Sequence, residues 1–108
     1  MIYKLVSSDT APQIKATITR EDDGSVVNMS GATVVLKFRA QYSTTILFEL
    51  TSSSAGSSLQ NGIAIFTFNA GNLDIATGMY EGEIEITYSN GVKETLYEIL
   101  EFHVRADF

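Results

Sequence analysis

The chain has 108 residues, no cysteine and one histidine, and its 7 basic and 13 acidic residues give a net charge of −6. The lack of cysteine excludes disulfides and thiolate zinc sites, and a single histidine excludes a multi-histidine metal site. An acidic chain lacks the positive surface that binds nucleic acids or anionic membranes, so we expect neither as a partner.

The length fits a single domain over residues 1–108, because compact domains most often have about 100–150 residues. The first eight residues lack the basic and then apolar stretches of a secretory signal peptide, so we expect none. No apolar run approaches the roughly 20 residues that a membrane-spanning helix needs.

Short segments rich in Val, Ile, Thr, Phe and Tyr lie between well-separated glycines, which is typical of an all-β sandwich or barrel. Residues 2–6 fit an edge strand. The next segment alternates apolar and polar residues, so we expect a strand that buries Ile14, Ala16 and Ile18. The acidic residues 21–25 fit a turn, because Asp-Gly readily takes a positive φ.

Two strands and a loop are expected next. Residues 33–39 direct Val34, Leu36 and Phe38 to one face. Residues 45–50 direct Ile46, Phe48 and Leu50 to one face in the same way. The serine-rich residues 52–58 fit an exposed loop.

The second half of the chain begins with a strand over residues 62–68, which has apolar residues on both faces. Ala64, Phe66 and Phe68 share one face, and Ile63 and Ile65 share the other. Over residues 80–88 an acidic stripe alternates with an apolar face: the stripe is Glu81, Glu83 and Glu85, and the inward residues are Tyr80, Ile84, Ile86 and Tyr88.

Ser89-Asn90-Gly91-Val92 is a strong hairpin signal and leads into a last strand over residues 93–104. That strand changes phase, because Tyr97 and Ile99 lie opposite the apolar set Leu96, Leu100, Phe102 and Val104. We expect either a β-bulge or a strand that runs past the sheet edge. The aromatic residues that fit inward positions are Phe38, Phe48, Phe66, Phe68, Tyr80 and Phe102.

Asp74, Gly78 and Tyr80 form a distinct pattern, in which an Asp starts a turn, a Gly ends it and a Tyr opens the next strand. In sandwich folds a tyrosine at this place can turn its hydroxyl back to the preceding backbone, the tyrosine corner. We therefore expect these three residues to form a structural corner.

Two longer patterns are more specific. Residues 23–34 read DG-x-x-V-x-x-x-GA-x-V, and residues 78–91 read G-x-Y-x-x-E-I-x-x-x-Y-S-x-G. Thr10-Ala11-Pro12-Gln13-Ile14 precedes them, and Phe102-His103-Val104 follows. In this order the segments resemble the immunoglobulin-like N-terminal domain of phage baseplate upper proteins and related phage tail modules.

The resemblance implies an immunoglobulin-like β-sandwich of about seven or more mostly antiparallel strands. It also implies a non-enzymatic virion protein, made in the host cytoplasm, that docks to other phage structural proteins in the tail, baseplate or fibre-attachment region. The docking would produce a homo- or hetero-oligomer within the virion.

No set of residues points to catalysis, a cofactor or a small-molecule substrate. Glu81, Glu83 and Glu85 would lie about 7 Å apart in a row, and three equal carboxylates fit a solvated or partner-facing stripe; a weak cation site stays open. Residues 22–24 lack the spacing of a calcium loop. His103 fits an exposed strand position and has no nucleophile in a recognisable motif.

The candidate contact residues are the apolar ones on the opposite phase and the acidic stripe, namely Ile63, Ile65, Tyr97, Ile99, Glu81, Glu83 and Glu85. Addition of a neighbour's strand to a sheet edge is a second mode of assembly. Two alternatives stay open: a capsid cement or decoration protein, and a carbohydrate-binding module for host-surface glycan with a platform drawn from Tyr3, Tyr42 and Tyr97.

Overall fold

The computed structural model describes residues 2–9, 12–20, 22–53, 58–96 and 99–106. These residues include a short 3₁₀ turn, η1 (Leu59–Asn61), and no helix among them is long and apolar enough to cross a membrane. They form eight strands: β1 (Ile2–Val6), β2 (Gln13–Thr17), β3 (Thr33–Ala40), β4 (Ile46–Thr51), β5 (Ile63–Thr67), β6 (Gly78–Thr87), β7 (Lys93–Thr95) and β8 (Leu100–Arg105).

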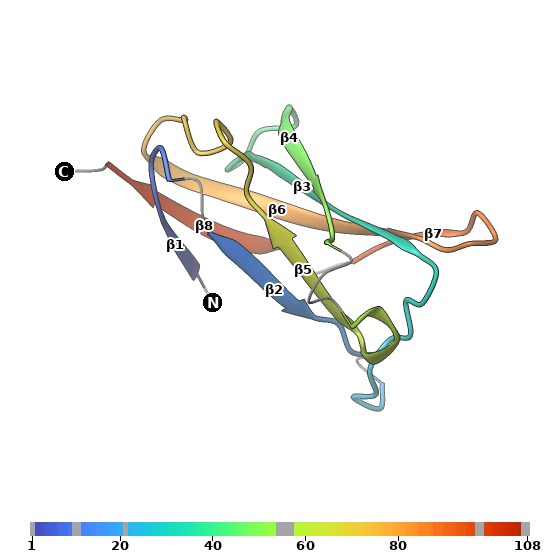
Figure 1. Cartoon of the computed structure of the whole chain (residues 1–108). Coiled ribbons are helices and arrows are strands. Elements are labelled where there is room, and N and C mark those ends of the chain that lie inside the picture. The colour runs from blue at the N-terminus through green and yellow to red at the C-terminus, as the bar shows by residue number, and fades with distance from the viewer. Residues whose placement is uncertain (1, 10–11, 21, 54–57, 97–98, 107–108) are drawn as a thin grey trace.

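The strands form two sheets that pack as an immunoglobulin-like sandwich, as the sequence predicts (Figure 1). The larger sheet has the order β1-β8-β6-β3-β4, with β7 also paired to β6, and the smaller sheet is β2-β5. Of the strand pairs that the described residues form, β1–β8 is parallel and the others are antiparallel. This division, with β2 and β5 facing β3, β6 and β8, is that of the immunoglobulin fold.

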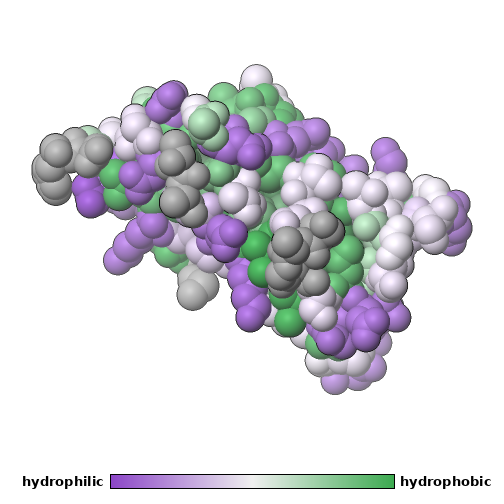
Figure 2. Space-filling view, in the orientation of Figure 1, coloured by the Kyte–Doolittle hydropathy of each residue, from purple (hydrophilic) through white to green (hydrophobic). Residues whose placement is uncertain are grey.

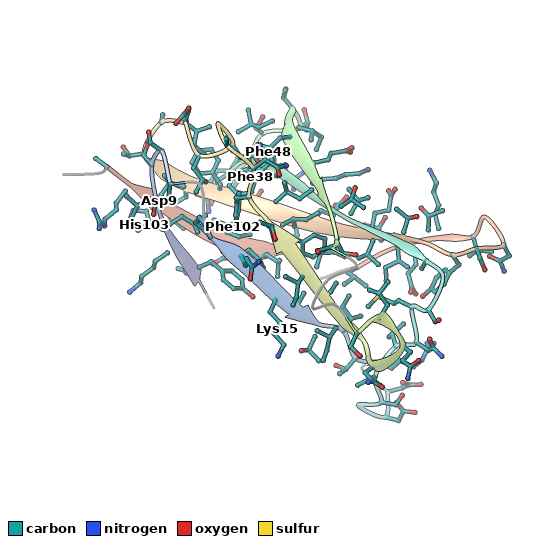
Figure 3. All side chains as sticks on the ribbon, viewed as in Figure 1. Asp9, Lys15, Phe38, Phe48, Phe102 and His103 are labelled. Carbon is teal, nitrogen blue, oxygen red and sulfur yellow. The ribbon has the colours of Figure 1, made fainter. Side chains whose placement is uncertain are left out.

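The core lies between the sheets and combines inward residues of the strands with residues of the connections, such as Met29 and Leu73, both fully buried. Phe38, on β3, is fully buried and lies at the centre of an aromatic cluster (Figure 3). Its ring stacks on Phe48 at 4.6 Å and on Tyr80 at 5.2 Å between centroids, and lies 5.0 Å from Phe102. It also meets Phe68 edge-on at 5.9 Å, which ties the two sheets together.

The chain crosses from the larger to the smaller sheet directly after β4. The Ser52 backbone N–H donates to the Val34 carbonyl oxygen, and the Ser53 N–H donates to the Ile65 carbonyl oxygen, each at 2.8 Å. Both serines are half-buried, so this part of the expected exposed loop is instead held between the sheets. Residues 54–57 of that loop lie outside the described residues.

One inward assignment is wrong. Ile46 was expected to share a buried face with Phe48 and Leu50, but it is 42% exposed. The β3–β4 register shifts between Phe38 and Arg39: Phe38 pairs with Phe48, and Arg39 pairs with Ile46. This bulge places Leu47 opposite no residue of β3 and turns Ile46 to the outer face with Arg39.

The expected last strand is interrupted. Both of its parts pair with β6, but the register pairs Glu85–Thr95 and Gly82–Leu100 are three residues apart along β6 and five residues apart along the last strand. The last strand is thus two residues longer than the part of β6 that it faces, an irregularity of the kind expected here, and because two is an even number Leu96 and Leu100 both still pack against the core. The hairpin before it forms as expected, with the Tyr88 N–H donating to the Val92 carbonyl oxygen at 2.8 Å.

Tyr80 closes a corner with the turn that precedes β6. Its hydroxyl donates to the backbone carbonyl oxygen of Ala76 at 2.5 Å, the contact that a tyrosine corner requires. Gly78 has a φ of 143°, which side chains rarely allow, and Asp74 takes part through its backbone N–H, which donates to the Gly71 carbonyl oxygen.

Gly82 on β6 leaves room for the core. A Cβ atom there would lie 2.7 Å from Leu36 Cδ1 and 2.8 Å from Phe102 Cε2, and both of these side chains are fully buried.

We therefore expect Gly82→Ala to lower the free energy of unfolding by about 1–3 kcal/mol in urea denaturation. Thr87→Ala, on the outer face of β6, is the control and should change it by less than about 0.5 kcal/mol. Equal effects of the two variants would contradict the close packing at Gly82.

The corner makes a second prediction about stability. Tyr80→Phe keeps the buried ring but removes the donor to Ala76, so we expect a loss of about 1 kcal/mol in the free energy of unfolding. Tyr42→Phe removes a hydroxyl from a side chain that is 91% exposed and should have no effect. An unchanged midpoint of urea denaturation for Tyr80→Phe would show that the hydrogen bond from Tyr80 to Ala76 does not stabilise the fold.

Candidate interaction surfaces

The acidic stripe lies on the outer face of the larger sheet, on its central strand β6, and is paired within the molecule. Glu85 Oε2 lies 3.1 Å from Lys37 Nζ, and Glu81 Oε1 lies 3.3 Å from Arg39 Nε. Glu83 is the register partner of Lys37. The hydrogen bond with Glu85 raises the pKa of Lys37, while partial burial opposes this.

The stripe is therefore not a free anionic surface. Glu49 of β4 is the register partner of Lys37 on the side away from β6, and its negative charge also raises the pKa of Lys37. Charges of opposite sign therefore alternate across β6, β3 and β4. Side chains of the two ion pairs are 16–25% exposed, which limits what a partner could reach. Any partner would have to compete with pairs that the sheet register already provides.

Ile63 and Ile65 lie on the outer side of the smaller sheet and are half-buried. They alternate with Ala64 and Phe66, which are fully buried in the core. The structure thus gives the smaller sheet a partly apolar outer face, which Figure 2 shows as hydrophobic atoms along β5.

Ile99 belongs to a different part of the molecule. It lies just before β8 of the larger sheet and is 42% exposed. Tyr97 lies outside the described residues. Among the described candidates, Ile63 and Ile65 therefore belong to the smaller sheet, whereas Ile99 lies beside the larger one.

The most exposed apolar group that the structure describes is at the β3–β4 hairpin, and we call it the hairpin tip: Tyr42, Ile46 and Leu47. These side chains are 91%, 42% and 47% exposed. Figure 2 shows hydrophobic atoms at the upper edge, over this hairpin. The sequence signal for it was the run Ile46-Leu47-Phe48, which puts apolar residues on both faces, but only the bulge decides which of them turn outward.

Tyr42 also has an unusual backbone, with a φ of 64°. A left-handed conformation costs an aromatic residue roughly 1–2 kcal/mol relative to the usual regions. Its neighbours hold the turn, since the Ser43 N–H donates to the Ala40 carbonyl oxygen and the Thr45 N–H donates to Ser43 Oγ. Tyr42 thus keeps a strained backbone while its ring contacts little of its own chain.

A groove of about 450 Å³ lies between the start of the β2–β3 connection and β7. Its apolar lining comes from Ile18, Val27 and Leu96, and its rim carries Arg20, Asp22 and Glu94. Glu94 already accepts a hydrogen bond from the Tyr88 hydroxyl at 3.0 Å; burial, and then this bond, raise the pKa of Tyr88. The rim bears charges of both signs and does not define a ligand class.

The other polar candidates occupy structural positions. Asp23 accepts hydrogen bonds from the Ser25 hydroxyl and backbone N–H, which lower its pKa and close the turn. His103 is exposed on β8. Among the residues that the structure describes, no three His, Cys, Asp or Glu side chains lie together in a way that could hold a metal ion.

Tyr3 is not available for a glycan platform. Its ring stacks on Phe102 with centroids 5.3 Å apart, and the residue packs against the core. Of the three tyrosines considered for that platform, the structure leaves Tyr42 exposed, while Tyr97 lies outside the described residues.

Comparison with known proteins supports the fold. No protein-family model matches the chain, and no curated protein matches it in sequence. Among solved structures, CopC from Methylosinus trichosporium OB3b is similar, with a TM-score of 0.54 and 13% sequence identity; the match covers 98% of this chain and 85% of that chain. At this identity the likeness concerns the fold alone.

Proposed function

We propose that this protein is a non-enzymatic phage structural protein that docks to other virion proteins in the tail, baseplate or fibre-attachment region. The virion role rests on the two sequence patterns at residues 23–34 and 78–91, which resemble phage tail modules. The β-sandwich is consistent with that resemblance, and a rigid sandwich with exposed edges and loops suits docking better than chemistry.

The observation that carries the proposal is the hairpin tip. Tyr42 is 91% exposed on a backbone that is costly for tyrosine, and two further exposed apolar residues, Ile46 and Leu47, lie nearby in the chain. Aromatic residues at protein interfaces supply much of the binding energy, because they bury a large rigid area. A strained, solvent-exposed aromatic that contributes little to its own fold is best explained as a contact for another protein.

The contacts of the polar residues support a non-enzymatic role. The carboxylates of Glu81 and Glu85 pair with basic residues across the sheet, so their environments are those of a structural ladder. Catalytic carboxylates need environments that separate their pKa values around a cleft. Of the two carboxylates that line the groove beside β7, Asp22 lies in a turn, and Glu94 accepts a hydrogen bond from the Tyr88 hydroxyl at 3.0 Å.

The proposal is tested by mass spectrometry of purified particles of the phage that encodes the chain. We expect the protein in each particle at tens of copies or fewer, and reading frames for tail components beside its gene. Hundreds of copies would place it on the capsid as a decoration protein and overturn the tail assignment. Its absence from particles would overturn the virion role.

The hairpin tip predicts that stability and docking respond in opposite directions. Asn tolerates the left-handed conformation, so Tyr42→Asn should raise the free energy of unfolding by roughly 0.5 kcal/mol and lower incorporation into particles. The control Tyr42→Phe keeps the aromatic ring and the strained backbone, so its free energy of unfolding and its incorporation into particles should equal those of the unchanged protein. Normal incorporation of Tyr42→Asn would exclude the tip as the docking contact.

A further inference from the structure

The edges of the two sheets differ in how they are protected. The outer edge of β5 is occupied, because Ser53 and Ser58 both form backbone hydrogen bonds with it. The outer edge of β2 follows Pro12 and carries the exposed Lys15, two features that discourage strand pairing. Within the described residues no strand pairs with the outer side of β1 or β4, the two ends of the larger sheet (Figure 1).

The backbone hydrogen bonds of β1 and β4 show which backbone groups these two edges present. The Ser7 N–H donates to Arg105 of β8, so the alternate residues Ile2, Lys4 and Val6 direct their N–H and C=O groups away from β8. The Ser52 N–H donates to Val34 of β3. By the same alternation, Glu49 and Thr51 direct these groups away from β3, and the regular alternation ends at the bulge beside Leu47.

The directions of the strands are compatible with a continuous sheet. β1 runs parallel to β8, and the β8–β6, β6–β3 and β3–β4 pairs are each antiparallel, so β1 and β4 run in opposite directions. A second copy placed beside the first in the same orientation would therefore bring its β1 against β4 as an antiparallel strand. Antiparallel pairing is the more stable of the two arrangements.

We propose that copies of this chain join edge to edge, with β1 of one copy added to β4 of the next. The proposal rests on the docking function above and makes a second copy of the chain the partner. The main support is the charge on each edge. Lys4 is the exposed outward residue at the middle of β1, and Glu49 is an exposed outward residue of β4. The register that aligns residues 2–6 with residues 51–47 places Lys4 opposite Glu49 of the next copy.

The same charges disfavour the two symmetric arrangements. Antiparallel pairing of β1 with β1 over its full length sets Lys4 against Lys4. Antiparallel pairing of β4 with β4 over residues 47–51, beyond the bulge, sets Glu49 against Glu49. Like charges directly opposite each other destabilise a strand pair, and opposite charges stabilise it. The edges are thus complementary to each other and not to themselves, which gives a head-to-tail interface that forms rings or open chains.

Neighbouring side chains fit this register. Glu49 already lies beside Lys37, which lies beside Glu83, so Lys4 of the next copy would continue an alternating row across the outer face. Val6 would lie opposite Leu47, which is 47% exposed. The Val6 carbonyl oxygen accepts the Asp9 N–H at 3.3 Å, so the new backbone bonds would come mainly from Ile2 and Lys4.

Charge reversal tests the interface with the purified full chain. Sedimentation of the unchanged protein from about 10 µM to about 1 mM should show self-association, since one added strand buries a small area. Lys4→Glu and Glu49→Lys should each weaken it roughly tenfold. The double variant, and an equal mixture of the two single variants, should restore it. A monomer at all concentrations, or a single variant that associates normally, would overturn the proposal.

Cysteine cross-linking tests the register, because the chain has no cysteine of its own. In the proposed register residues 4 and 49 form a hydrogen-bonded pair with Cα atoms about 5.5 Å apart, within disulfide reach. Lys4→Cys combined with Glu49→Cys should give a ladder of multimers on oxidation. The control, Lys4→Cys with Thr51→Cys, is displaced by two residues, or about 7 Å, and should not. Multimer ladders of equal extent from the two double-cysteine variants, or no ladder from either, would overturn the proposed register.

These outcomes separate the two proposals. A strictly monomeric chain that is nevertheless found in phage particles would overturn edge pairing and leave the docking function standing. A chain that self-associates through β1 and β4 but is absent from particles would overturn the virion role and leave edge pairing standing.

Discussion

The packing of Phe38 is the interaction on which the rest of the structure depends. Its ring contacts aromatic side chains from β4, β6 and β8 and the ring of Phe68, which follows β5 on the smaller sheet. Tyr3 of β1 stacks on Phe102 in turn, so a chain of rings runs across the larger sheet from β1 to β4. Because both end strands are held by this cluster, the positions of the two open edges follow from the core.

Much of the inward face could be predicted from the sequence, and the exceptions have identifiable causes. Val34, Leu36 and Phe38 follow the period of two and are fully buried, because a strand alternates faces without reference to its neighbours. Ile46 breaks the rule because a bulge depends on how β3 and β4 meet around the hairpin. Tyr3 is a candidate for the glycan platform in the sequence because the short segment around it gives no sign that Phe102, far along the chain, supplies a stacking partner.

The surfaces were harder to predict than the core, because they depend on strand order. Glu81 and Glu85 read as a free acidic stripe in sequence, yet Arg39 and Lys37 lie more than forty residues away along the chain and directly across the sheet. Alternation shows that these residues point outward but does not show which strand lies beside which. The edges were hard to predict for the same reason. The sequence predicts an edge strand over residues 2–6, but only the pairing of β1 with β8 decides which of its backbone N–H and C=O groups have no partner strand.

Edge charges and the ion-paired face together suggest how a sandwich of this kind can assemble without uncontrolled aggregation. An open strand edge attracts any extended chain, and proteins commonly block it with charge or proline. A single Lys on one edge and a single Glu on the other block each edge against itself while leaving the two complementary. The outer face adds little attraction of its own, since its carboxylates are already paired. Specificity would then reside in one strand pair and in the hairpin tip beyond it, while the buried aromatic cluster holds both in place.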